Sequence, residues 1–166
     1  MEKSLSETSI IGRFSIGLYC IENSIKRKGL FNNHTVNVII AKLSEFIYTN
    51  NVKWVTEIQA YLPKYFKTTI NDNITEEFYN ELINFYKNIN YKDIFEIIEL
   101  CSEIALNHMY GGIIDNSPET IKLTQQILEK TGMINEFDFK KISKNHPMTD
   151  NNKWGVNFNY NHFKPK

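Results

Sequence analysis

The sequence lacks an excess of charge of either sign. Nineteen basic residues balance nineteen acidic residues, so the formal net charge is zero. Because long-range attraction to nucleic acid or to an anionic membrane requires a basic field, we expect neither as a partner. No charged segment followed by an apolar run opens the chain, and no apolar stretch approaches the roughly 20 residues of a membrane span. These absences favour a cytoplasmic protein.

Cysteine and histidine are also scarce. Cys20 and Cys101 fall within apolar helical patterns without an activating neighbour in the sequence, so we expect free, buried and unreactive thiols. The four histidines form none of the short spacings with His, Cys or Glu that are typical of metal sites. Glycine-rich phosphate-binding motifs are missing as well. We therefore expect no metal and no cofactor.

No linker rich in proline, glycine or serine divides the 166 residues, which indicates a single domain over 1–166. Apolar residues recur at intervals of three and four along most of the chain, and no segment shows the alternation of a strand. We expect an all-α fold, a single-domain irregular helical bundle of about six helices. Residues 1–135 would form its helical core, and 136–166 an aromatic-rich, mostly irregular C-terminal tail packed on that core.

The stretch 94–108 is the most apolar of these segments. Its apolar residues fall on one side of a helix, whereas Glu96, Glu99 and Glu103 fall on the other. This division predicts a helix with one face in the core and one in water. We expect the rest of the chain to pack around it.

Polar residues that precede apolar segments predict where the helices begin. Ser4 and Glu7 have capping-box spacing for a first helix that ends at Gly29. The other expected caps are Asn32 or Asn33, Thr75, Ser117 followed by Pro118, and the C-terminal Gly132.

Beyond Glu136 the helical periodicity is lost and aromatic residues are dispersed among Asn and Lys. A segment so rich in aromatic residues is more typical of a tail strapped across a core than of a disordered one. We expect Trp154-Gly155 to anchor the tail in a groove near the turn at Tyr110-Gly111-Gly112, where glycine permits close approach.

The helical segments between Glu76 and Glu103 carry seven carboxylates against Lys87 and Lys92. Four of these carboxylates recur at helical spacing and predict an anionic ridge on an otherwise neutral protein. One interpretation is a solvated face, and the other is a docking surface for a basic partner, to which nearby tyrosines add contact area. The anionic ridge comprises Asp93, Glu96, Glu99 and Glu103, and the tyrosines are Tyr79 and Tyr86.

Several short runs resemble a group of small all-helical bacterial proteins. They are Arg13 to Tyr19, Met109 to Ile114, Ser117 to Thr120, and Asn152 to Gly155. The group is associated with candidate immunity proteins of bacterial polymorphic toxin and contact-dependent inhibition systems. The resemblance implies a protein partner, a toxin domain, that the chain binds and neutralises by occlusion without catalysis. In that case we expect the anionic ridge to face a basic surface, such as that of a nuclease.

Two other functions stay open. One is a helical scaffold or regulatory binding protein unconnected with toxins, which makes no demand on the anionic ridge. The other is a small enzyme with a site near His108, in a cleft by Gly111-Gly112 and with Glu103 or Asp115 as its carboxylate. The sequence leaves the oligomeric state open.

Overall fold

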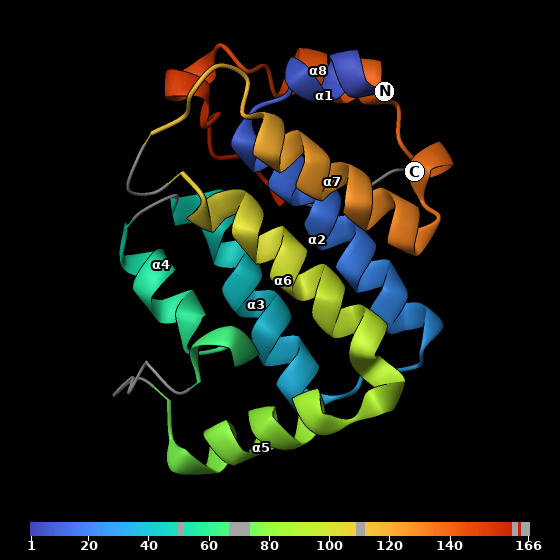
Figure 1. Cartoon of the computed structure of the whole chain (residues 1–166), viewed down its shortest axis with the longest axis vertical. Coiled ribbons are helices and arrows are strands. Elements are labelled where there is room, and N and C mark those ends of the chain that lie inside the picture. The colour runs from blue at the N-terminus through green and yellow to red at the C-terminus, as the bar shows by residue number, and fades with distance from the viewer. Residues whose placement is uncertain (50–51, 67–73, 109–111, 161–162, 164–166) are drawn as a thin grey trace.

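The computed structural model describes residues 1–49, 52–66, 74–108, 112–160 and 163, and within them the protein is an all-α bundle without a β-strand (Figure 1). None of the described helices is long and apolar enough to cross a membrane. The helices in chain order are α1 (Glu2–Ser6), α2 (Ile10–Arg27), α3 (His34–Thr49), α4 (Val52–Gln59), η1 (Pro63–Tyr65), α5 (Glu76–Lys87), η2 (Ile89–Tyr91), α6 (Lys92–Leu106), α7 (Pro118–Thr131), η3 (Ile134–Glu136), α8 (Phe139–Asn145) and η4 (Asp150–Lys153).

The helix at the centre of the bundle is α2, and the expectation that the 94–108 segment would be central was wrong. Every residue of α2 from Ile10 to Leu18 is buried, because α3, α6 and α7 all pack against it (Figure 1). Small and polar residues among these buried positions, such as Ser15, weaken the apolar signal of α2 in the sequence. The Ser15 hydroxyl is satisfied inside the core, where it donates to the Ile11 carbonyl oxygen at 2.8 Å. The 94–108 segment forms α6, which buries one face against α2.

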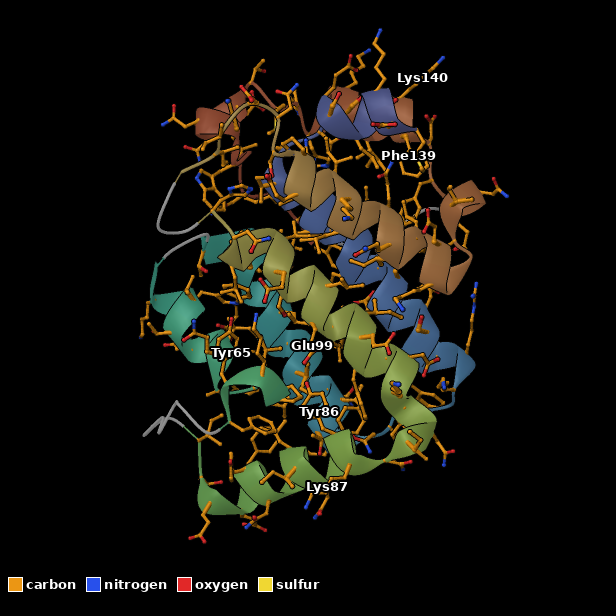
Figure 2. The ribbon with its side chains drawn as sticks, viewed as in Figure 1. Tyr65, Tyr86, Lys87, Glu99, Phe139 and Lys140 are labelled. Carbon is orange, nitrogen blue, oxygen red and sulfur yellow. The ribbon has the colours of Figure 1, made fainter. Side chains whose placement is uncertain are left out.

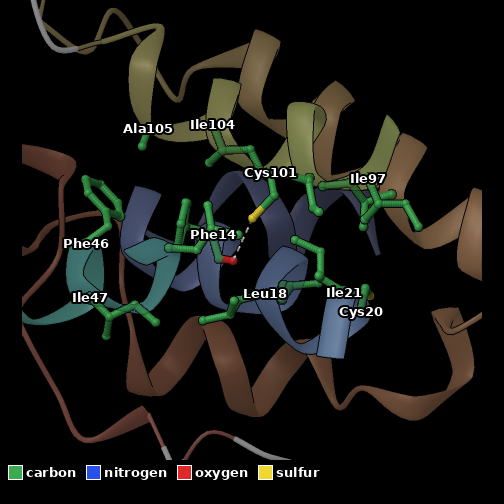
Figure 3. Close-up of a cluster of buried hydrophobic side chains, with 14 of the residues drawn as sticks. Phe14, Leu18, Cys20, Ile21, Phe46, Ile47, Ile97, Cys101, Ile104 and Ala105 are labelled. Carbon is green, nitrogen blue, oxygen red and sulfur yellow. Dashed lines mark hydrogen bonds between the residues drawn. The ribbon is translucent and has the colours of Figure 1, made fainter. Parts of the chain in front are cut away.

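α2 and α6 approach closely at Gly17. A Cβ atom there would lie 2.8 Å from the Cys101 Sγ atom and 3.2 Å from the Ile127 Cδ1 atom, so a larger residue would push the helices apart. The Cys101 thiol donates to the Phe14 carbonyl oxygen at 3.6 Å (Figure 3). Both cysteines are free and buried, as predicted, and burial raises the pKa of the Cys20 thiol to about 12.

Local caps explain where most of the helices begin. The predicted capping box was wrong, because the side chain of Ser9 accepts the Gly12 N–H and begins α2. The backbone just before α2 pairs instead with the tail, since the Ser9 N–H donates to the His146 carbonyl oxygen at 2.8 Å. This pairing splits the first predicted helix into α1 and α2. The confirmed caps are Asn33 for α3, Thr75 for α5, Ser117 with Pro118 for α7, and Gly132 at the end of α7.

The tail is more regular than predicted, because it contains α8 and η4. α8, together with the split first helix, raises the number of α-helices in the described residues from the expected six or so to eight. α8 lies beside α1 at one end of the bundle, and α5 crosses the opposite end (Figure 1). Both additions arise from pairing between the two chain ends, which helical periodicity does not report.

Trp154 anchors the tail on α2 and α3. Its carbonyl oxygen accepts the Ile11 N–H at 2.9 Å, and its indole packs against Phe46 with ring centroids 6.2 Å apart. The next residue, Gly155, approaches so closely that a Cβ atom would lie 2.8 Å from Ser9 Cβ. Tyr110 and Gly111 lie outside the described residues, so an anchoring groove beside them stays a prediction.

We expect Gly17→Ala to lower the free energy of unfolding by about 1–3 kcal/mol, because the added methyl group overpacks the contact between α2 and α6. Cys101→Ala removes the sulfur atom that this methyl group would meet. The double variant should therefore lose less stability than the sum of the two single losses. Thermal unfolding of the four proteins, followed by circular dichroism, completes the cycle, and strictly additive losses would contradict the close contact.

Candidate functional site

Three of the four carboxylates in the anionic ridge are paired with lysines from other segments. These lysines come from the end of α2, from η1 and from α7. The ion pairs are Asp93–Lys28 at 2.8 Å, Glu96–Lys130 at 2.6 Å and Glu103–Lys64 at 2.7 Å. Lys92 on α6 itself lies 4.0 Å from Glu96 as well. The anionic ridge is therefore less negative than the sequence predicts, because its short ion pairs are made by lysines that are distant along the chain.

Glu99 is the member of the anionic ridge that has no counter-ion among the described residues. In the described part of the chain it forms no ion pair and accepts no hydrogen bond. Burial raises the pKa of its carboxyl group above the ordinary glutamate value, and Lys64 opposes this rise while Glu103 and Glu96 add to it. The pKa of Glu96 moves the other way, because the hydrogen bond from Lys130 lowers it. A partly buried carboxylate that has no ion-pair partner within the described residues is a candidate contact for a cation of a partner.

A groove of about 380 Å³ opens along the outer face of α6. The Glu96–Lys130 and Glu103–Lys64 ion pairs line it, Glu99 lies between them, and Leu100 adds an apolar side chain. Figure 2 shows Glu99 near Tyr86. We name this feature the α6 groove, and its lining residues are Lys64, Glu96, Glu99, Leu100, Glu103 and Lys130.

The two tyrosines predicted as partner contacts form hydrogen bonds within the chain. The Tyr79 hydroxyl donates to the Phe66 carbonyl oxygen at 3.2 Å, and the Tyr86 hydroxyl donates to the Tyr61 carbonyl oxygen at 3.0 Å. Both side chains are half-buried, and burial raises the pKa of the Tyr86 hydroxyl. They hold the segment 61–66, which includes η1, against α5. Contact between these tyrosines and a partner stays a prediction.

His108 lies just beyond α6, beside a second cavity of about 390 Å³. Its Nδ1 atom lies 3.1 Å from the Gly112 carbonyl oxygen, and its Nε2 atom is hydrogen-bonded to the Ser117 hydroxyl. Because a carbonyl oxygen only accepts, the network assigns the proton to Nδ1 and makes Nε2 the acceptor of the hydroxyl proton. Both ring nitrogens are therefore occupied by groups of the chain itself.

The two carboxylates expected to assist His108 are Glu103 and Asp115. The Glu103 carboxylate is paired with Lys64. Asp115 lies on the loop before α7, where its backbone carbonyl oxygen accepts from the Lys153 ammonium at 2.6 Å. Neither carboxylate bonds to the imidazole within the described residues, and Gly111 of the expected cleft lies outside them. Proximity along the chain suggested these partners, but the structure does not bring them onto the ring.

Arg13 is a buried polar residue that the sequence analysis did not single out. Its guanidinium donates to the Leu5 carbonyl oxygen at 2.9 Å, to the Ser117 carbonyl oxygen at 3.1 Å and to the Thr120 hydroxyl at 2.6 Å. Burial lowers its pKa to about 10, so it stays protonated near neutral pH. The Ser117 hydroxyl bonds both His108 and the Thr120 hydroxyl. Arg13 and His108 thus belong to one network, which positions the start of α7.

Comparisons with protein-family models, with curated proteins and with solved structures found no match. Across the described ranges, no group of three or more His, Cys, Asp or Glu side chains is arranged to hold a metal ion. The α6 groove and the Arg13–His108 network are therefore interpreted from their own geometry.

We expect Arg13→Lys to lower the free energy of unfolding by about 3 kcal/mol, because one ammonium cannot reach all the acceptors of the guanidinium and buried acceptors are left unpaired. Arg27→Lys is the matched control, because the Arg27 side chain is 57% exposed and its partner Glu136 is also at the surface. Urea unfolding of both variants measures the difference. Equal, small losses would show that the Arg13 network does not hold α7.

We expect Glu99→Gln to raise the melting temperature by about 1–2 °C at pH 7, because the carboxyl pKa is raised in the folded chain and ionisation therefore weakens the fold. The gain should disappear as the pH falls below the ordinary glutamate pKa, where the wild-type group is neutral as well. Glu96→Gln should have the opposite effect at pH 7, because Lys130 lowers the pKa of Glu96 and stabilises its ionised form. A fall in melting temperature for Glu99→Gln at pH 7 would mean that Glu99 has a stabilising partner.

Proposed function

We propose that this chain is a non-catalytic protein of the immunity type, which binds a toxin domain through the α6 groove and neutralises it by occlusion. The observation that carries the proposal is the half-buried carboxylate of Glu99 inside this groove, which no other described residue pairs. A basic side chain of a partner would supply the counter-ion that the described chain does not. The resemblance of the short sequence runs to immunity proteins supports the same class.

The packing contacts on the inner side of α6 and around η1 favour a groove that binds as a rigid surface. The inner face of α6 packs against α2 where Gly17 meets Cys101, and Tyr79 and Tyr86 hold the segment beside η1. A preorganised surface loses little conformational freedom when a partner binds, so more of the contact free energy appears as affinity. Occlusion needs that affinity and no reactive group.

The two alternatives have weaker support. An enzyme with its site at His108 would use the imidazole as a base on the Ser117 hydroxyl that it binds. Ser117 is fully buried, so that hydroxyl is not exposed to a substrate. A scaffold or regulatory protein would use the same groove with a partner that is not a toxin. Co-expression with a toxin separates these classes.

The test of the class is co-expression in a bacterium with the product of the adjacent upstream gene. We expect that product to arrest growth when expressed alone and to be neutralised by this chain. Glu99→Lys places a cation in the groove and should weaken binding by at least about tenfold, so that neutralisation is lost. Glu77→Lys, at an exposed position of α5 outside the groove lining, is the matched control. This variant should neutralise the toxin like the wild type.

Two results would contradict the proposal. If the neighbouring gene product does not arrest growth, it is not a toxin, and the proposal loses its expected partner. Full neutralisation by Glu99→Lys, with the variant shown to be folded by circular dichroism, would exclude the α6 groove as the interface.

A further inference from the structure

We infer that the α6 groove selects a partner segment in which one basic side chain lies between two carboxylates, and that it disfavours a uniformly basic surface. This inference rests on the proposed function, because it assumes that the groove is the binding surface. It differs from the expectation for an unneutralised anionic ridge, which would favour a partner that is basic throughout.

The order of charges along the groove carries the inference. At one end Lys130 is paired with Glu96, and at the other end Lys64 is paired with Glu103. Glu99 stands between the two pairs without a counter-ion in the described residues. The side chains of Lys130 and Lys64 are 45% and 60% exposed, against 39% and 25% for their glutamate partners, so both lysines are accessible to a partner. The groove therefore presents a cation, an anion and a cation in sequence.

Exposed ion pairs of this kind contribute little to stability, because solvent screens them and the side chains lose rotamer freedom in forming them. Lys64 and Lys130 can therefore turn toward carboxylates of a partner at little cost in stability. A partner that places cations along the whole groove would instead meet both ammonium groups with like charge. Among the groove's carboxylates, Glu99 is the one that forms no ion pair with a described residue, so we expect it to bind the basic group of a partner.

The dimensions of the groove limit the spacing of the partner's charges. Glu96 and Glu103 are separated by two turns of α6, a rise of about 10 Å. The volume of about 380 Å³ suits a single inserted side chain rather than a whole helix. Leu100 can pack against the aliphatic stem of an inserted arginine or lysine. The matching segment has its two carboxylates about 10 Å apart, as on residues two turns apart in a helix, with the basic residue one turn from each.

Peptide display tests the inference without a known partner. Immobilised full-length protein is used to select from a random peptide library, with counter-selection on the Glu99→Gln protein. We expect the surviving peptides to share a basic residue flanked on both sides by Asp or Glu, and to bind the wild type at least about tenfold more tightly than Glu99→Gln. Uniformly basic peptides would overturn the inference and leave the proposed function standing. An absence of peptides that depend on Glu99 would overturn both.

Charge reversal of the lysines provides the matched arm. The double variant Lys64→Glu with Lys130→Glu should select uniformly basic peptides, because it converts the groove to negative charge throughout. Lys87→Glu with Lys122→Glu changes two exposed lysines outside the groove lining and should keep the wild-type preference. Thermal unfolding shows whether each variant is folded. If the folded Lys64→Glu, Lys130→Glu variant selects the same peptides as the wild type, the two lysines do not determine peptide choice. That result would overturn the inference.

Discussion

A buried guanidinium holds the start of this bundle together. Arg13 is fully buried in α2, and its described acceptors include backbone carbonyl oxygens of α1 and of the residue that caps α7. Each of these acceptors would lower stability if it were left unpaired away from water, so α1, α2 and α7 keep a fixed relation at this end. The other end of α7 then carries Lys130 to Glu96. The Arg13 hydrogen bonds at the start of α7 thereby help to position Lys130, which lies at the other end of α7 and contributes to the charge pattern of the groove.

α6 links this core to the surface that we propose as functional. Its inner face meets α2 closely because Gly17 has no side chain, and its outer face carries carboxylates along the groove. The outer ion pairs matter more for the pattern of charge than for stability. Glu99 differs from its neighbours, since the fold withdraws its carboxylate partly from water and the described chain does not pair it. A folded protein that keeps such a group loses some stability, and a binding role would account for its presence.

Local signals predicted the helical class and most helix ends, because caps such as Thr75 and Gly132 act within a few residues. Long-range contacts explain what the sequence did not predict. Pairing of Ser9 with His146 splits the first helix, and the two chain ends together order α1 and α8. Glu96, Glu99 and Glu103 line the same groove of α6. The lysines that form the short ion pairs with Glu96 and Glu103 lie 34 or more residues away, so periodicity does not report them. Arg13 was overlooked because a charged residue inside an apolar pattern reads as surface until its acceptors are known.

The most direct test of the account is a nuclear magnetic resonance titration of the side-chain carboxyl groups of Glu99 and Glu96 in the free protein. The account predicts that Glu99 titrates above the ordinary glutamate value, because burial disfavours its charge, and that Glu96 titrates below it, because Lys130 pairs with it. A Glu99 carboxyl that titrates at or below the ordinary value would show that it already has a counter-ion or full hydration. That result would contradict the claim that the α6 groove holds an unpaired charge for a partner.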